Sequence, residues 1–94
     1  MLFTCLNKQG VKSIKGFTVQ CTGRFTSEYQ EGARKITIDT EPGKLPNGKY
    51  CDIIRSDAFI KWDDGTPISK EKQQEILNNF IEAIEFQNME VIVD

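Results

Sequence analysis

The sequence predicts an α+β fold: a mostly antiparallel sheet with one long C-terminal helix packed on one face and a final strand after it. Three observations predict this fold. Apolar and polar residues alternate through much of the first two thirds of the chain, an apolar stripe of helical period follows Ser69, and residues 89–93 alternate again. With 94 residues, we expect one domain over residues 1–94.

Period-two alternation marks the predicted strands. In residues 17–22 and 34–40 the apolar side chains occupy every second position, as in a strand with one buried face. Residues 41–48 hold two prolines and two glycines and are predicted to form a loop. Residues 59–62 either extend the sheet or pack over it. Shorter strands are expected at residues 2–6, 11–15, 24–29 and 49–54.

The helix is predicted from its ends as well as from its apolar stripe. Ser69 is a good N-cap, because its hydroxyl accepts an otherwise unpaired N–H of the first turn, and Glu71 suits the helix dipole there. We expect the helix to end near Gln87, with Asn88 as a left-handed cap. Trp62 and Phe86 are expected in the core. The apolar stripe comprises Ile76, Leu77, Phe80, Ile81 and Ile84.

The composition narrows the chemistry. The chain has no histidine, which excludes a histidine general base and Cys–His zinc sites. Its three cysteines, Cys5, Cys21 and Cys51, form no Cys-x-x-Cys pair and are expected to be reduced, buried thiols. Asp63 and Asp64 precede a glycine but lack the further ligands of a calcium loop, so they are expected in a turn. We therefore expect no enzyme, no catalytic residue, no metal and no cofactor.

Charge is unevenly distributed along the chain. Residues 1–50 carry eight basic and four acidic side chains (8 − 4 = +4), whereas residues 51–94 carry four basic and ten acidic ones (4 − 10 = −6). An acidic half argues against a nucleic-acid partner and favours a basic protein partner. No apolar run approaches the roughly 20 residues of a membrane span. We expect a cytoplasmic protein without a membrane partner.

The C-terminal half resembles a family of small immunity proteins from bacterial polymorphic-toxin and contact-dependent growth inhibition systems. The resemblance covers roughly residues 49–94. Where members of that family place prolines after the tryptophan, this chain has Asp63-Asp64-Gly65, and where they often end the helix with glycine, it has Asn88. The residues that carry the resemblance are Tyr50 to Ile54, Ile60-Lys61-Trp62, Asp63-Asp64, Pro67-Ile68-Ser69, Lys72, Ile76-Leu77, Ile81 and Glu90 to Asp94.

The resemblance implies a protein that binds and neutralises a cognate toxin domain, often a nuclease, by forming a tight complex in the cytoplasm. It implies that the toxin is the C-terminal domain of a large secreted effector. The alternative is a generic protein-interaction module or small regulatory subunit without a toxin partner. Gene neighbourhood separates the two, because immunity genes usually lie directly downstream of the toxin gene.

Partner-facing surfaces differ from partner to partner in such a family, so the site residues are predicted from charge and position. One group is expected on loops near the strand–helix junction and in the proline-rich loop, and the other on the outer face of the helix. The loop group comprises Asp57, Asp63, Asp64 and Glu41. The helix group comprises Glu71, Glu75 and Glu82.

Overall fold

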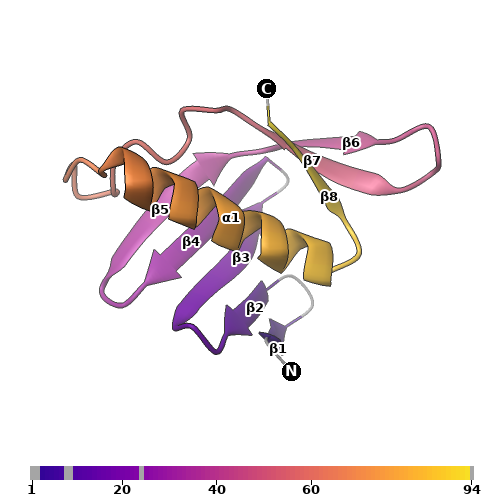
Figure 1. Cartoon of the computed structure of the whole chain (residues 1–94). Helices are drawn as coiled ribbons and strands as arrows, with labels where there is room; N and C mark the ends of the chain where they lie inside the picture. The colour runs from indigo at the N-terminus through magenta and orange to yellow at the C-terminus, as the bar shows by residue number, and fades with distance from the viewer. Residues whose placement is uncertain (1–2, 8–9, 24, 94) are drawn as a thin grey trace.

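The computed structural model describes residues 3–7, 10–23 and 25–93, and it has the predicted α+β fold. Of the predicted strands, positions 2 and 24 lie outside the described residues. Five strands are followed by a second, smaller group of strands and one helix, with a last strand after the helix (Figure 1). The first five strands are β1 (Phe3–Asn7), β2 (Gly10–Ser13), β3 (Phe17–Gly23), β4 (Thr26–Glu31) and β5 (Arg34–Asp39).

These five strands form one antiparallel sheet in sequence order, each paired with the next. The turn between β4 and β5 contains Gly32 at a φ of 61°, in the left-handed region that glycine enters without steric cost. Alternation decides which side chains face the core. In β5, for example, Ile36 and Ile38 are buried while Lys35 and Thr37 are exposed on the opposite face.

The prediction of a loop over residues 41–48 is wrong in its first half. β6 (Glu41–Lys44) pairs antiparallel with β7 (Tyr50–Ile54), and residues 45–49 form the turn between them. Pro42 is tolerated because β6 is an edge strand, whose free side needs no N–H donor. Gly43 allows close packing, since a Cβ atom there would lie 3.0 Å from Cys51 Sγ and the thiol would have to move by a few tenths of an ångström.

The final strand β8 (Glu90–Val93) pairs with β7 in parallel, and β6, β7 and β8 form a separate three-stranded sheet. Parallel neighbours need a crossover connection, and the helix α1 (Lys70–Phe86) supplies it. As Figure 1 shows, α1 lies across one face of the five-stranded sheet. After the C-terminal end of α1, the chain returns as β8 beside β7.

The predicted signals set both ends of α1. Ser69 is the N-cap, and its hydroxyl accepts a 3.2 Å hydrogen bond from the backbone N–H of Lys72. Beyond the C-cap Gln87, Asn88 has a φ of 64° and ends the helix in the left-handed conformation. The buried residues of α1 are Ile76, Asn79, Phe80, Ala83 and Ile84.

The hydrophobic core lies between α1 and the five-stranded sheet. Of residues 59–62, Phe59 and Trp62 are buried in the core, and Trp62 is only 5% exposed, which confirms its predicted place. Ile60 is 48% exposed, and Lys61 is exposed and pairs with Pro67 in an isolated bridge. Phe86 is 37% exposed, contrary to expectation, because it is the last residue of α1; its ring packs against the ring of Phe3. The other core residues are Phe3, Val11, Phe17, Val19, Tyr29, Ile36, Ile38, Ile54, Phe59, Ile68, Ile76, Phe80, Ala83 and Ile84.

The three cysteines are free, but only Cys51 is buried. Cys21 is half-buried and Cys5 is exposed, so the prediction of three buried thiols is wrong. Cys5 is exposed because β1 is an edge strand, with a neighbouring strand on one side only.

Candidate functional site

The outward face of α1 carries a row of carboxylates along its whole length. Glu75, Glu82 and Glu85 follow Glu71 at offsets of 4, 11 and 14 residues, close to whole turns of an α-helix. All four side chains are exposed, on the side of α1 turned away from the core. We call these four residues the acidic row. Glu85 was not among the predicted site residues, although its helical spacing places it in the same row.

The acidic row is only partly neutralised. Glu75 pairs with Lys72 on the same helix, and Glu82 pairs with Lys15 at 3.5 Å. Within residues 3–7, 10–23 and 25–93, no ion pair reaches Glu71 or Glu85. The two ends of the row therefore present unpaired negative charge to solvent.

Asp63 has a structural role that the sequence did not indicate. Its carboxylate accepts hydrogen bonds from the backbone N–H of Thr37 at 2.8 Å and from the hydroxyl of Thr37 at 2.7 Å. Its own N–H donates to the carbonyl of Lys35 at 2.9 Å. Asp63 thus pairs with backbone groups along the outer edge of β5, where an unpaired edge would otherwise be open to other strands.

Asp64 lies in the expected turn. Its carboxylate accepts a hydrogen bond from the backbone N–H of Thr66 at 2.9 Å, and Gly65 follows with a φ of 90°. That hydrogen bond, with the nearby charge of Arg34, holds the pKa of Asp64 below its ordinary value. Asp64 is therefore a fully exposed, ionised carboxylate that is available to a partner.

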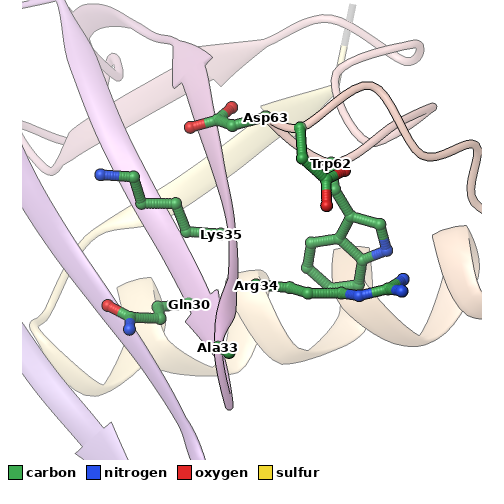
Figure 2. A pocket seen from close by; sticks show the side chains of 7 residues that line it. Gln30, Ala33, Arg34, Lys35, Trp62 and Asp63 are labelled. Carbon is green, nitrogen blue, oxygen red and sulfur yellow. The ribbon is translucent and has the colours of Figure 1, made fainter.

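A shallow pocket of about 380 Å³ lies beside this turn (Figure 2). The guanidinium of Arg34 lies 5.8 Å from the centroid of the Trp62 ring and covers it, in the geometry of a cation–π contact. Asp63 and Asp64 line the same pocket with Gln30, Ala33 and Lys35. Both signs of charge meet here, so the pocket is less acidic than the loop sequence suggests.

The remaining two predicted site residues lie on other elements. Asp57 follows β7 and is held by Arg55 through two hydrogen bonds of 3.0 and 3.2 Å. Glu41 is exposed at the start of β6, in the second sheet. The structure thus places the helix group on one face and Asp63 with Asp64 in one pocket, while Asp57 and Glu41 belong to neither.

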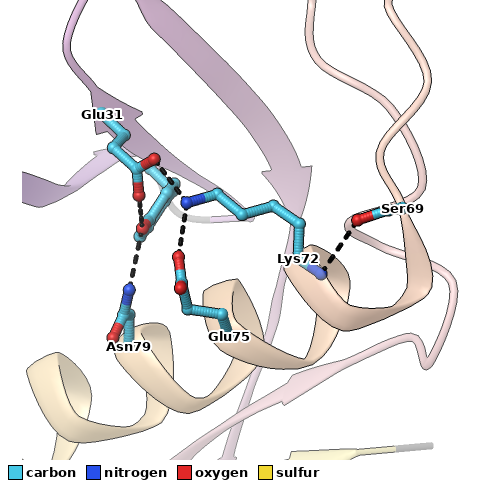
Figure 3. A network of polar contacts seen from close by, with 6 residues as sticks. Glu31, Ser69, Lys72, Glu75 and Asn79 are labelled. Carbon is cyan, nitrogen blue, oxygen red and sulfur yellow. Dashed lines mark hydrogen bonds and ion pairs between the residues drawn. The ribbon is translucent and has the colours of Figure 1, made fainter.

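A polar network joins α1 to β4 beneath one end of the acidic row (Figure 3). The hydroxyl of Tyr29, a residue that is 0% exposed, donates to Glu31 at 2.8 Å and accepts from Asn79 Nδ2 at 3.1 Å. Lys72 bridges Glu31, at 2.6 Å, and Glu75. Burial raises the pKa of Tyr29, so its hydroxyl stays protonated. The network is a structural connection between helix and sheet.

Because of the Glu31–Lys72 pair, we expect part of the free energy of unfolding to be lost in acid. Burial alone raises the pKa of Glu31, but hydrogen bonds from Lys72 and Tyr29 and the charge of Lys72 outweigh it, so the pKa is lowered overall. A carboxyl group with a lowered pKa contributes stability above its unfolded pKa of about 4.3, and this is lost as pH falls through the folded value. Lys72→Met is expected to cost about 1 kcal/mol at neutral pH.

The measurement is urea unfolding of the wild type and Lys72→Met between neutral and acid pH. The difference in free energy of unfolding should shrink as pH falls, because Glu31 becomes neutral in both proteins. Lys70→Met is the control, since it removes an exposed lysine from the same helix outside the network. A difference that stays constant down to the acid limit would contradict the prediction.

Within the residues described, no group of three or more Cys, Asp or Glu side chains is arranged to hold a metal ion. The one helix of this part of the chain is not long and apolar enough to cross a membrane. Comparisons with family models, with curated proteins and with solved structures find no match. The comparisons thus place the chain in no family.

Proposed function

We propose that the chain is an immunity protein that binds and neutralises a cognate toxin domain with a basic surface in the cytoplasm. The observation that carries the proposal is the acidic row on the outward face of α1. An exposed acidic surface speeds encounter with a basic partner and disfavours partners of the wrong charge. The resemblance of residues 49–94 to toxin-system immunity proteins supplies the kind of partner.

The acidic row also suits binding because its support is rigid. α1 is capped at both ends, and its inner face packs into the core through five buried residues. A surface fixed in this way loses little conformational entropy when a partner binds. The mechanism is steric: the complex covers the active site or the substrate-binding surface of the toxin, and no bond is made or broken.

A rescue assay tests the function. The C-terminal domain encoded by the gene immediately upstream is expressed alone and together with this chain, and growth is followed. The proposal expects that the domain stops growth, that co-expression restores it, and that the two proteins co-purify. Growth arrest that persists with this chain present and folded would contradict immunity for that pair.

Charge reversal then tests the surface. Glu71→Lys with Glu85→Lys is expected to weaken binding of the toxin domain roughly tenfold at low salt, mainly through a slower association rate. The matched control is Asp39→Lys with Glu41→Lys, because both residues are exposed on β strands away from α1, neither is in an ion pair within the described residues, and the change in net charge is the same. Equal loss in both variants would contradict a role of the acidic row.

A further inference from the structure

A hollow of about 220 Å³ lies where the two sheets meet the C-terminal end of α1, away from the acidic row. It is smaller than the roughly 300–1,000 Å³ of pockets for drug-sized molecules, so it suits a single side chain or a small fragment. Apolar side chains from β3, α1 and the segment after α1 form most of its wall. The lining residues are Val19, Cys21, Ser27, Asp52, Ile84, Gln87 and Met89.

Asp52 supplies the one carboxylate of this wall. It lies in the middle of β7, opposite Val91 of β8, and its side chain is half-buried. Among the residues that the structure describes, no hydrogen bond or ion pair reaches this carboxylate, and no lysine or arginine lines the hollow. Burial raises the pKa of Asp52, as expected for a carboxyl group without a compensating partner.

The helix end adds to the negative potential at the hollow. Ile84 and the C-cap Gln87 line it, and the carbonyl end of an α-helix carries partial negative charge that favours cations. The last turn of α1 contains no basic residue to neutralise this charge. Two other polar lining groups already have partners: the Cys21 thiol donates to the carbonyl of Gly23, and the Gln87 amide donates to the carbonyl of Ala83.

We propose that the hollow is a binding site for a primary ammonium group on a short apolar stem, with Asp52 as its counter-ion. The stem would contact Val19, Ile84 and Met89, and the ammonium would donate to the carboxylate. An alkylammonium has both parts, whereas an anion would meet the charge of Asp52 and the helix end. A free amine and the side chain of a protein-borne lysine share this chemistry, and the site does not depend on a toxin partner.

The test is an NMR titration of the full chain with n-butylammonium chloride, with n-butanol in equal sodium chloride as the matched neutral ligand. Signals of Ile84 and Met89 are expected to shift saturably with the amine and far less with the alcohol. Asp52→Asn should weaken binding at least about tenfold, since a charge-assisted hydrogen bond is lost. Asp57→Asn alters an exposed carboxylate outside the hollow and should leave the affinity for n-butylammonium unchanged.

Asp52→Asn has nearly the same shape and removes a partly buried charge, so the variant is expected to fold, which circular dichroism checks. N-acetyl-lysine methylamide in a parallel titration separates the two sources: binding of both ligands fits a protein-borne lysine, and binding of butylammonium alone fits a free amine. Three results would each overturn the proposal: no shift at Ile84 or Met89, equal binding of butanol, or equal binding by folded Asp52→Asn.

Discussion

Replacing Phe80 with alanine is expected to destabilise the chain by about 3–5 kcal/mol, the usual cost of removing a buried aromatic ring. Phe80 is 0% exposed at the middle of α1, and its ring lies 5.7 Å from that of Phe59. Phe59 belongs to the segment between β7 and α1, so the cavity would loosen both the helix and the segment beneath it. A chain of 94 residues has a total stability of roughly 5–14 kcal/mol, so this loss is a large fraction.

Urea unfolding followed by circular dichroism measures the effect. Phe86→Ala is the control, because it removes the same side chain from the same helix at a position that is 37% exposed. Phe86 still contacts Phe3, with ring centroids 5.2 Å apart, so a loss of about 1 kcal/mol is expected there. Equal losses at the two positions would mean that the core does not lie under the middle of α1.

The helix was predictable because its signals are local. Ser69 caps its first turn, Asn88 ends it in the left-handed conformation, and the apolar stripe between them has the helical period. The antiparallel character of the first sheet was predictable for a similar reason, since each strand pairs with the next one along the chain, but its strand order was not predicted from the sequence. Strands that follow one another through short turns can be recognised from two local features, the alternation of apolar and polar residues and the glycines of the turns.

The second sheet was not predictable in the same way. Pro42 and Gly43 indicate a loop by composition, and only the edge position of β6 and the closeness of Cys51 explain them. The parallel pairing of β7 with β8 joins segments on either side of α1, and nothing in either strand specifies its partner. Such pairing is decided by the packing of the whole chain.

In the candidate site, too, features set by neighbouring residues were predictable, and contacts between residues far apart in the sequence were not. The exposure of Glu71, Glu75 and Glu82 follows from helical spacing, and the structure places them as expected. The bonds of Asp63 to Thr37 cross 26 positions of sequence, so its structural role was not visible. The buried hydrogen bond of Asn79 was missed for two reasons. A polar residue beside an apolar stripe is normally expected on the flank of a helix, and the acceptor, Tyr29, is 50 positions away in the sequence.

The Tyr29–Asn79 hydrogen bond is expected to couple helix and sheet measurably. Tyr29→Phe keeps the ring, which stacks on Phe17, but leaves Asn79 Nδ2 without its acceptor and Glu31 without one donor. Unpairing buried polar groups costs about 1–3 kcal/mol. Asn79→Ala leaves the Tyr29 hydroxyl bonded to Glu31 and is expected to cost less from lost hydrogen bonding, with a further contribution from the small cavity.

A double-mutant cycle isolates the interaction from these other costs. Tyr29→Phe, Asn79→Ala and the double variant are unfolded in urea, and a coupling free energy of about 1 kcal/mol is expected because the second substitution removes a partner already lost. Tyr50→Phe is the control, since that tyrosine is 62% exposed and its change should be near zero. If the two single effects add to within about 0.3–0.5 kcal/mol, this hydrogen bond contributes nothing of its own, and α1 is held on the sheet by apolar packing and by its ion pairs Lys72–Glu31 and Lys15–Glu82.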